Sequence, residues 1–292
     1  MDLSDFFQLL ISGLTVGGIY ALMALGFHII YVATRILNFA HGAIVLLGGL
    51  LALTLIQHVH LNFFFVLTLI LVIGWLLGLF FNRVIIEPLK YLSHGIQIIC
   101  LLAVSMVIEN ASALIWGKEP LPFPPFPGPE RPYIFGNVVV QPQFLWIISL
   151  TLLGLIVTQW ILKRTMIGKA IRATANNSTA AMLMGISIQK TYSVAFGIAL
   201  ALSALAGMIT SPVTFAGGYL AIPMTIKGFT ACVLGGMAGS IASILGGFLL
   251  GIMEALTAGL ISTAYEEAII MALLLVFLLV RPQGLFSRKG AE

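Results

Sequence analysis

The chain has 292 residues, of which 60% are hydrophobic and only 8% are charged, with a mean hydropathy of +1.11. Water-soluble globular proteins carry about 25% charged residues, so the composition excludes that class and indicates a protein that lies in a lipid bilayer. The formal net charge of +4 comes from basic residues that flank apolar segments and form no patch, which argues against a nucleic-acid partner.

Long apolar stretches follow one another along the chain, and a membrane-spanning helix needs roughly 20 such residues. Backbone polar groups inside lipid must be satisfied within the segment, so continuous runs of this kind predict helices. We therefore expect an all-α polytopic membrane protein, a single domain over residues 1–292 with about eight to nine transmembrane helices. The predicted spans are 8–33, 36–56, 63–83, 95–116, 144–162 and 191–210, with two or three more in 225–281.

Lysine and arginine concentrate in short cytoplasmic loops of membrane proteins, and this rule sets the expected orientation. Basic residues flank the loop at 83–90, fill the loop 163–190 and close the chain at 281–289, so these regions should be cytoplasmic. The N-terminus carries Asp2 and Asp5 without a basic residue, so it should lie outside. An external start and a cytoplasmic end require an odd number of crossings, which favours nine, with three in the C-terminal region.

Proline is concentrated in the loop 117–143, which holds eight of the twelve prolines of the chain. Proline fixes φ and removes a backbone donor, so this loop is predicted to be extended and external instead of spanning the membrane. A stiff connector and a docking surface for a partner are both compatible with this composition.

The loop 163–190 is the longest polar stretch on the predicted cytoplasmic side. Residues 168–184 have helix-compatible spacing, with Lys169 and Arg172 on a polar side, and Gly185 fits as the helix stop. A helix on the membrane surface, a solvated connector and a helix that docks into another protein all remain open from spacing alone.

Six blocks of sequence resemble, in the right order, permease subunits of bacterial ABC importers for branched-chain amino acids. The loop 163–190 carries the pattern G-x-x-x-R-A followed by A-x-x-x-G-I. The other blocks are RILNFAHGA at 35–43, IEN at 108–110, GFTACVLGGMAGSIASILGGFLLGIMEAL at 228–256, STAYEE at 262–267 and RPQGLF at 281–286. Together they cover nearly the whole chain.

The resemblance implies an ABC-importer permease whose cytoplasmic coupling helix binds separate ATPase subunits. The implied coupling residues are Gly168, Lys169, Arg172, Ala173, Ala181 and Gly185. The implied partners are two ABC ATPase subunits that hold ATP and Mg, a second homologous permease subunit, and a periplasmic or extracellular substrate-binding protein, all at a bacterial inner membrane. The chain shows no GxxxxGK[ST] phosphate-binding loop, so we expect neither a cofactor nor an enzymatic activity in this subunit.

Several polar or small residues within the spans are candidates for the translocation path. Asn38 and His41 are predicted to share a helical face, where they would line the path or bond to another helix. Gly235 and Gly236 would either expose amides to a substrate carboxylate or allow tight packing. Glu254 would serve as a structural pair or a conformational latch, because a carboxylate in a span must find a partner.

The predicted function is ATP-driven import of branched-chain or related amino acids by alternating access. Similar permeases carry urea, short amides or aromatic acids, and nothing in this sequence sets the solute. A channel or an intramembrane enzyme fits less well, because no recognised filter segment, HExxH or GxSxG motif is present. Glu109 stands where the family has a glutamine, and we expect it to reach the outer interface.

Overall fold

The computed structural model describes residues 3–128, 132–135, 138–218, 220–237, 239–281 and 284–286. Parts of the predictions above that concern Asp2, Pro129, Arg288 and Lys289 lie outside these residues. In chain order the elements are α1 (Leu3–Thr34), α2 (His41–Gln57), α3 (Phe63–Phe81), the π-helix η1 (Asn82–Ile86), α4 (Glu87–Leu89), α5 (His94–Trp116), β1 (Tyr133–Phe135), β2 (Val138–Val140), α6 (Pro142–Arg164), α7 (Met166–Asn176), α8 (Ser178–Leu183), α9 (Ile188–Thr214), α10 (Ala221–Gly235), α11 (Ser240–Leu260), the 3-10 helix η2 (Thr263–Tyr265) and α12 (Glu266–Val280).

Apolar helices dominate the described chain, which confirms the all-α prediction. Six of them are long and apolar enough to cross a membrane, namely α1, α3 with its extension to Leu89, α5, α6, α9 and α11. Three shorter apolar helices within the described residues are α2, α10 and a part of α12. The C-terminal region therefore holds three helices, as the sequence favoured, and α10 is one of the short ones.

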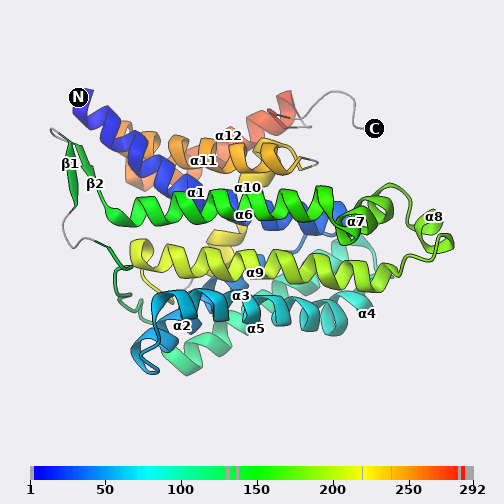
Figure 1. Ribbon diagram of the computed structural model, residues 1–292. Coiled ribbons are helices and arrows are strands. Elements are labelled where there is room, and N and C mark those ends of the chain that lie inside the picture. Colours follow the sequence, from blue (N-terminus) through cyan, green and yellow to red (C-terminus); the bar gives the residue numbers. More distant parts are fainter. Residues whose placement is uncertain are drawn as a thin grey trace.

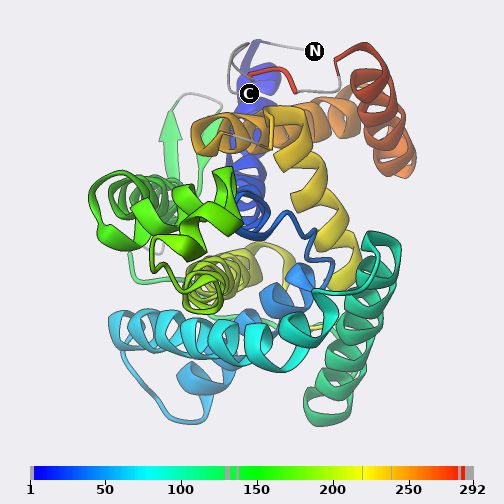
Figure 2. The ribbon, with the colours of Figure 1, turned by 90° about the vertical axis from the view of Figure 1, so that its right-hand side faces the viewer.

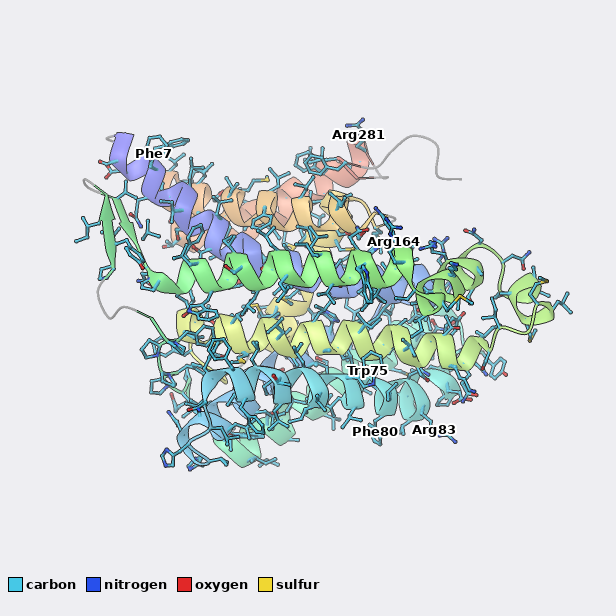
Figure 3. The ribbon with its side chains drawn as sticks, viewed as in Figure 1. Phe7, Trp75, Phe80, Arg83, Arg164 and Arg281 are labelled. Carbon is cyan, nitrogen blue, oxygen red and sulfur yellow. The ribbon has the colours of Figure 1, made fainter. Side chains whose placement is uncertain are left out.

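The long helices run roughly along a common direction, and the two ends of the bundle differ (Figure 1). The N-terminus and the β1–β2 hairpin lie at one end, which we call the hairpin end, and α7 and α8 lie at the other. Arg83 and Arg164 lie toward the α7–α8 end, whereas Phe7 lies at the hairpin end (Figure 3). We call the α7–α8 end, formed by residues 82–93 and 163–190, the basic end.

Helix α9 lies at the centre of the bundle and α5 at its periphery (Figure 2). Of their most apolar windows, 83% of the α9 residues are buried but only 22% of the α5 residues. Both helices are apolar throughout, so hydropathy does not distinguish them. The difference comes from the small residues that let neighbouring helices approach α9.

Glycines bring α1 and α11 into backbone contact. A Cβ atom placed on Gly251 would lie 2.3 Å from the backbone nitrogen of Gly17, and one on Gly247 would lie 2.4 Å from the Cα of Ala21. Neither position has room for a side chain. Membrane helices associate through such close packing because lipid chains are already as apolar as leucine.

The proline-rich loop 117–143 packs against the hairpin end. Leu121 and Ala216 exchange backbone hydrogen bonds of 2.7 and 2.9 Å. The ring of Phe126 is 7% exposed and lies 4.6 Å from that of Phe63. The described part of this loop is therefore a non-spanning segment, as predicted, but it is folded onto the bundle instead of simply extended.

The α1–α11 contact predicts that a larger side chain at Gly251 strongly lowers the stability of the protein. Gly251→Leu should lower the free energy of unfolding by about 3 kcal/mol, because the new side chain meets backbone that cannot rotate away. The matched control is Gly95→Leu, since a Cβ on this helical glycine meets no atom within 4 Å. Thermal unfolding in detergent, followed by size-exclusion chromatography, should separate the two variants; equal midpoints would contradict the proposed contact.

Candidate functional site

A buried ion pair joins α10 to α11 inside the bundle. The Nζ atom of Lys227 lies 2.5 Å from Oε1 of Glu254, and the two side chains are only 15% and 12% exposed. Tyr20 of α1 donates its hydroxyl hydrogen to the same carboxylate oxygen at 3.0 Å. Charges inside a membrane bundle are costly and persist where they are paired, so this cluster ties three helices together at one point.

Sequence reasoning singled out Glu254 and missed Lys227. The signal was available, because Lys227 interrupts an apolar stretch well away from either end and therefore needs a partner. The partner stands 27 residues later, so local spacing could not identify it. The second carboxylate oxygen of Glu254 is buried and accepts no hydrogen bond from the described residues. This oxygen can therefore accept a further hydrogen bond.

The first turns of α2 and α10 meet inside the bundle. The Gly42 amide donates to the Thr225 hydroxyl at 2.9 Å, and that hydroxyl donates to the Ala221 carbonyl at 2.8 Å. A Cβ on Gly42 would lie 2.0 Å from the same carbonyl oxygen, so only glycine permits this junction.

Glu109 of α5 caps the start of α10. Its Oε1 atom accepts the Ala221 amide hydrogen at 3.2 Å, and the residue is 6% exposed. The expectation that Glu109 reaches the outer interface is therefore wrong. The first amides of a helix lack hydrogen-bond partners within the helix and carry partial positive charge. The Glu109 carboxylate accepts the hydrogen of one such amide and places a negative charge next to them.

His41 and Asn38 occupy different positions around the start of α2. His41 is fully buried, with Nε2 at 2.9 Å from the Ser203 hydroxyl oxygen. Asn38 precedes the helix, and its Oδ1 accepts the Ala40 amide hydrogen at 3.1 Å. The predicted shared helical face is wrong, because α2 begins at His41 and not at residue 36. Their contribution to a translocation path stays a prediction.

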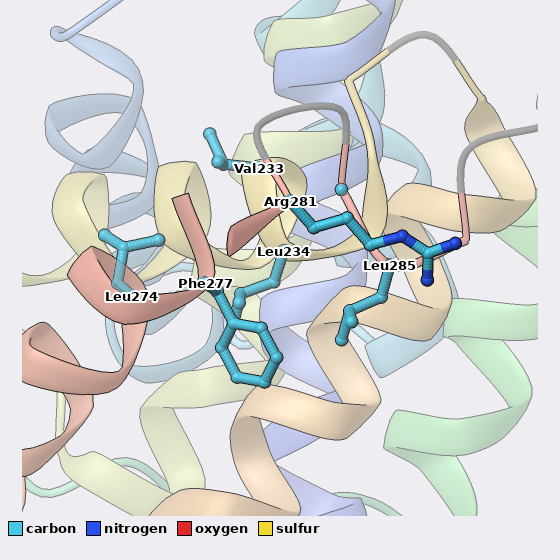
Figure 4. A pocket seen from close by; sticks show the side chains of 7 residues that line it. Val233, Leu234, Leu274, Phe277, Arg281 and Leu285 are labelled. Carbon is cyan, nitrogen blue, oxygen red and sulfur yellow. The ribbon is translucent and has the colours of Figure 1, made fainter. Parts of the chain in front are cut away.

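Gly235 and Gly236 close α10 at the basic end. A Cβ on Gly235 would lie 2.0 Å from the Ala242 carbonyl oxygen of α11, and Gly236 has a φ of +117°. The Leu285 amide donates to the Leu234 carbonyl at 2.9 Å, which satisfies a carbonyl that the helix end leaves free. Figure 4 shows this junction, where α10, α12 and the C-terminal segment surround a small pocket. Gly235 is thus closely packed against α11, and Gly236 has a φ that favours glycine; a contact of their amides with a substrate stays a prediction.

Helix α10 connects the contacts described above, which are otherwise separate. It receives Glu109 at its first amide, bonds to α2 through Thr225 and to α11 through Lys227, and ends under the C-terminal segment. It runs along one flank of the bundle between α11 and α5 (Figure 2), with Ile222 and Pro223 exposed. Its short length, polar ties and exposed edge make α10 the candidate element of the path.

The loop 163–190 folds into two short helices, α7 and α8, instead of one. The predicted continuous helix over 168–184 is wrong, because Asn177 interrupts it. Its Oδ1 atom accepts the Ala180 amide hydrogen at 2.9 Å and so caps α8, which competes with continuation of α7. Gly185, with a φ of +82°, follows the end of α8 as the predicted stop.

Helix α7 sits directly on the last turn of α6. The Thr165 hydroxyl accepts the Gly168 amide hydrogen at 3.1 Å and caps α7. A Cβ on Gly168 would lie 2.3 Å from the carbonyl oxygens of Ile161 and Leu162. Arg172 donates a hydrogen bond to the Leu162 carbonyl in the last turn of α6. A cation at this place stabilises the helix, because the last carbonyls of a helix lack partners within it. These contacts make α6 and α7 one mechanical unit.

The outer side of α7 and α8 is open and partly apolar. Ala181 is buried and Ala173 half-buried, whereas Lys169 is exposed. Leu183 and Met184 are 82% and 83% exposed at the tip of α8. Large apolar side chains exposed outside the spanning helices indicate a surface for another protein or for the membrane.

The chain is similar to known transport proteins over nearly its whole length. Residues 9–278 match the family described as the permease component of branched-chain amino acid transport systems. The high-affinity branched-chain amino acid permease protein LivH of Escherichia coli K12 is 28% identical, over 98% of this chain and 97% of its own. BraD of Pseudomonas aeruginosa, another high-affinity branched-chain amino acid permease protein, is 30% identical over 100% and 99%.

A more distant relative is the ribose import permease protein RbsC of Haemophilus influenzae. It is 27% identical over 80% of this chain and 70% of its own. No solved structure matches the chain.

The buried ion pair predicts a specific pattern of stability. Lys227→Met leaves the Glu254 carboxylate without its cation and should cost about 3–5 kcal/mol of unfolding free energy. The double variant Lys227→Met with Glu254→Gln removes both charges and should recover much of the loss. Lys118→Met, at an exposed loop position, is the control and should have no effect.

Thermal unfolding in detergent measures all four proteins under the same conditions. The pairing is contradicted by an unchanged midpoint for Lys227→Met, or by a double variant that is as unstable as the single one.

Proposed function

The chain belongs to the permease-component family of branched-chain amino acid transport systems, and we propose on that basis that it is one membrane-spanning subunit of an ATP-driven importer. The importer would contain a second permease subunit, two ABC ATPase subunits that bind ATP and Mg, and a substrate-binding protein outside the membrane. The observation that carries the proposal is the α7–α8 unit, because it offers an exposed surface at the basic end and is fixed rigidly to α6.

The ATPase would dock on α7 and α8. Lys169 supplies charge, while Leu183 and Met184 supply an apolar tip. Arg172 has a different task, because it bonds to the Leu162 carbonyl of α6 and positions α7. Docking and transmission of movement are thus assigned to different residues of the same unit.

The translocation path would run along α10. In an alternating-access cycle a bundle opens to one side at a time, and discontinuous short helices commonly form the site near the midplane. The N-terminal half of α10 would move, and the Lys227–Glu254 ion pair would break and form again during the cycle. Asn38 and His41 would support the neighbouring start of α2.

The basic end would face the cytoplasm of a bacterial cell and the hairpin end would face outside. Seven basic residues of 82–93 and 163–190 lie at the basic end against the single acid Glu87, which is the distribution that the positive-inside rule favours. The N-terminus would therefore lie outside and the chain would end in the cytoplasm.

The proposed solute is a branched-chain or related amino acid. LivH and BraD are described as branched-chain amino acid permeases and cover nearly their full lengths in the alignment, whereas the ribose permease covers less. The test is uptake of radiolabelled leucine into proteoliposomes that contain the complete importer, its binding protein and internal ATP. Uptake that continues without ATP would contradict an ATP-driven mechanism.

Two substitutions in the α7–α8 unit should separate docking of the ATPase from transmission of its movement. Leu183→Asp should abolish co-purification of the ATPase, because it places a charge in the apolar docking tip. Arg172→Ala should leave the ATPase bound but reduce leucine uptake at least tenfold, because α7 loses its bond to α6. Val59→Asp, at an exposed loop position at the hairpin end, is the control for an added charge and should change neither measurement. Normal co-purification of Leu183→Asp would locate the ATPase elsewhere.

Accessibility to a membrane-impermeant maleimide tests the orientation. Cys232 is fully buried, so a Cys100→Ala background should not react. In that background Ile134→Cys, at a 67% exposed hairpin residue, should react in intact cells, and Met184→Cys should react only after permeabilisation. The reverse pattern would invert the proposed topology.

A further inference from the structure

An apolar groove follows the outer face of the bundle between α3 and α6, with α9 as its floor. It encloses a cavity of about 220 Å³, and every residue that lines it is apolar except Thr158. Trp75 forms one wall, Val157 and Ile161 form the other, and the small Gly154 and Ala201 leave the space open. The groove runs parallel to the helices, as a lipid chain would lie.

The groove opens toward basic side chains at one end. Arg164 stands three residues beyond Ile161 on α6, and Arg83 stands just beyond the end of α3. In Figure 3 both arginines lie toward the basic end relative to Trp75, on the two helices that form the walls. Glu87, which accepts a hydrogen bond from Gln189 at 2.7 Å, is the single acid of residues 82–93 and 163–190, against seven basic residues, so the net charge of this end is positive.

We propose that this groove is a binding site for one acyl chain of an anionic phospholipid, whose headgroup lies between Arg83 and Arg164. Bulk lipid chains are as apolar as the groove, so the groove supplies shape and position but little selectivity. The arginines supply the selectivity, because basic residues near the membrane surface attract anionic headgroups. A bound lipid would pack against Ile161 near the end of α6. The carbonyl oxygen of Ile161 is also the atom that Gly168 of α7 approaches closely, so the lipid would lie next to the α6–α7 contact.

Tryptophan quenching by brominated lipid chains tests the site directly. Trp75 lines the groove, whereas Trp160 of α6 is 61% exposed outside it. Single-tryptophan variants that keep one or the other, in nanodiscs, should respond differently. Brominated phosphatidylglycerol at low mole fraction should quench Trp75 at least threefold more than brominated phosphatidylcholine does, whereas the same ratio should be smaller at Trp160, which lies one helical turn from Arg164 but outside the groove.

Substitutions at the headgroup end test the charge. Arg83→Gln or Arg164→Gln should each lower the phosphatidylglycerol preference at Trp75 to less than about half of its original value. Arg281→Gln removes an arginine that lies away from the groove walls and is the control. Equal quenching of Trp75 by both lipids, or no effect of either arginine, would overturn the proposal.

Native mass spectrometry of the full chain with all tryptophans gives a second measurement that does not depend on those variants. One phosphatidylglycerol should remain bound, and it should be lost in Val157→Phe, which fills the groove, but kept in Ile156→Phe on the neighbouring exposed face. If Trp75 is shielded from both lipids in the assembled importer, a protein subunit covers this face and the lipid site is excluded.

Discussion

Helices in a bilayer gain little by burying apolar side chains against one another, because the lipid they leave is equally apolar. This scaffold depends instead on backbone contact at small residues. A Cβ on Gly207 of α9 would lie 1.8 Å from the Val45 carbonyl oxygen of α2, and one on Gly78 of α3 would lie 2.4 Å from the Phe196 carbonyl oxygen. The same type of contact joins α1 to α11. Each of these contacts allows no added carbon atom, so each fixes how its two helices fit together.

Helix α10 is attached in two different ways along its length. Its C-terminal half is held like the scaffold, since a Cβ on Gly246 of α11 would lie 2.2 Å from the Ala231 carbonyl oxygen. Its N-terminal half has one such close approach, that of Gly42 of α2 to the Ala221 carbonyl, and is otherwise held by Glu109, Thr225 and Lys227 through hydrogen bonds and an ion pair. Polar contacts exchange partners with little change in volume, whereas interlocked backbones cannot slide without opening voids. We therefore assign the proposed movement in the transport cycle to the polar contacts of the N-terminal half.

The sequence predicted the helices well and their interruptions poorly, for a physical reason. Continuous apolar runs identify a segment that must bury its backbone, so α3 begins at Phe63, where the predicted span begins. Interruptions depend on single side chains whose partners come from elsewhere in the fold. Asn177 ends α7 through a local cap that propensity only suggests, and Lys227 is stable only because Glu254 faces it. Glu109 was misplaced because its partner is the start of a helix on a distant segment. Of the proposed path residues, Gly235 and Gly236 end α10 and Glu254 pairs with Lys227 of α10, and this link required the structure.

A continuous series of contacts connects the proposed docking surface to α10. In the proposed cycle, movement of α7 would pass to α6 through the Gly168 contact, where backbone meets backbone. α6 bonds to α1, because the Thr151 hydroxyl donates to the Gly18 carbonyl at 3.0 Å. Tyr20 follows on α1 and donates to Glu254, which holds Lys227 of α10. Contiguity alone does not establish coupling, which requires an element with two arrangements. The link from α7 to α6 is a backbone contact that can transmit a displacement, and the exchangeable element that we propose in this series is the carboxylate of Glu254, which has a second oxygen without a partner among the described residues.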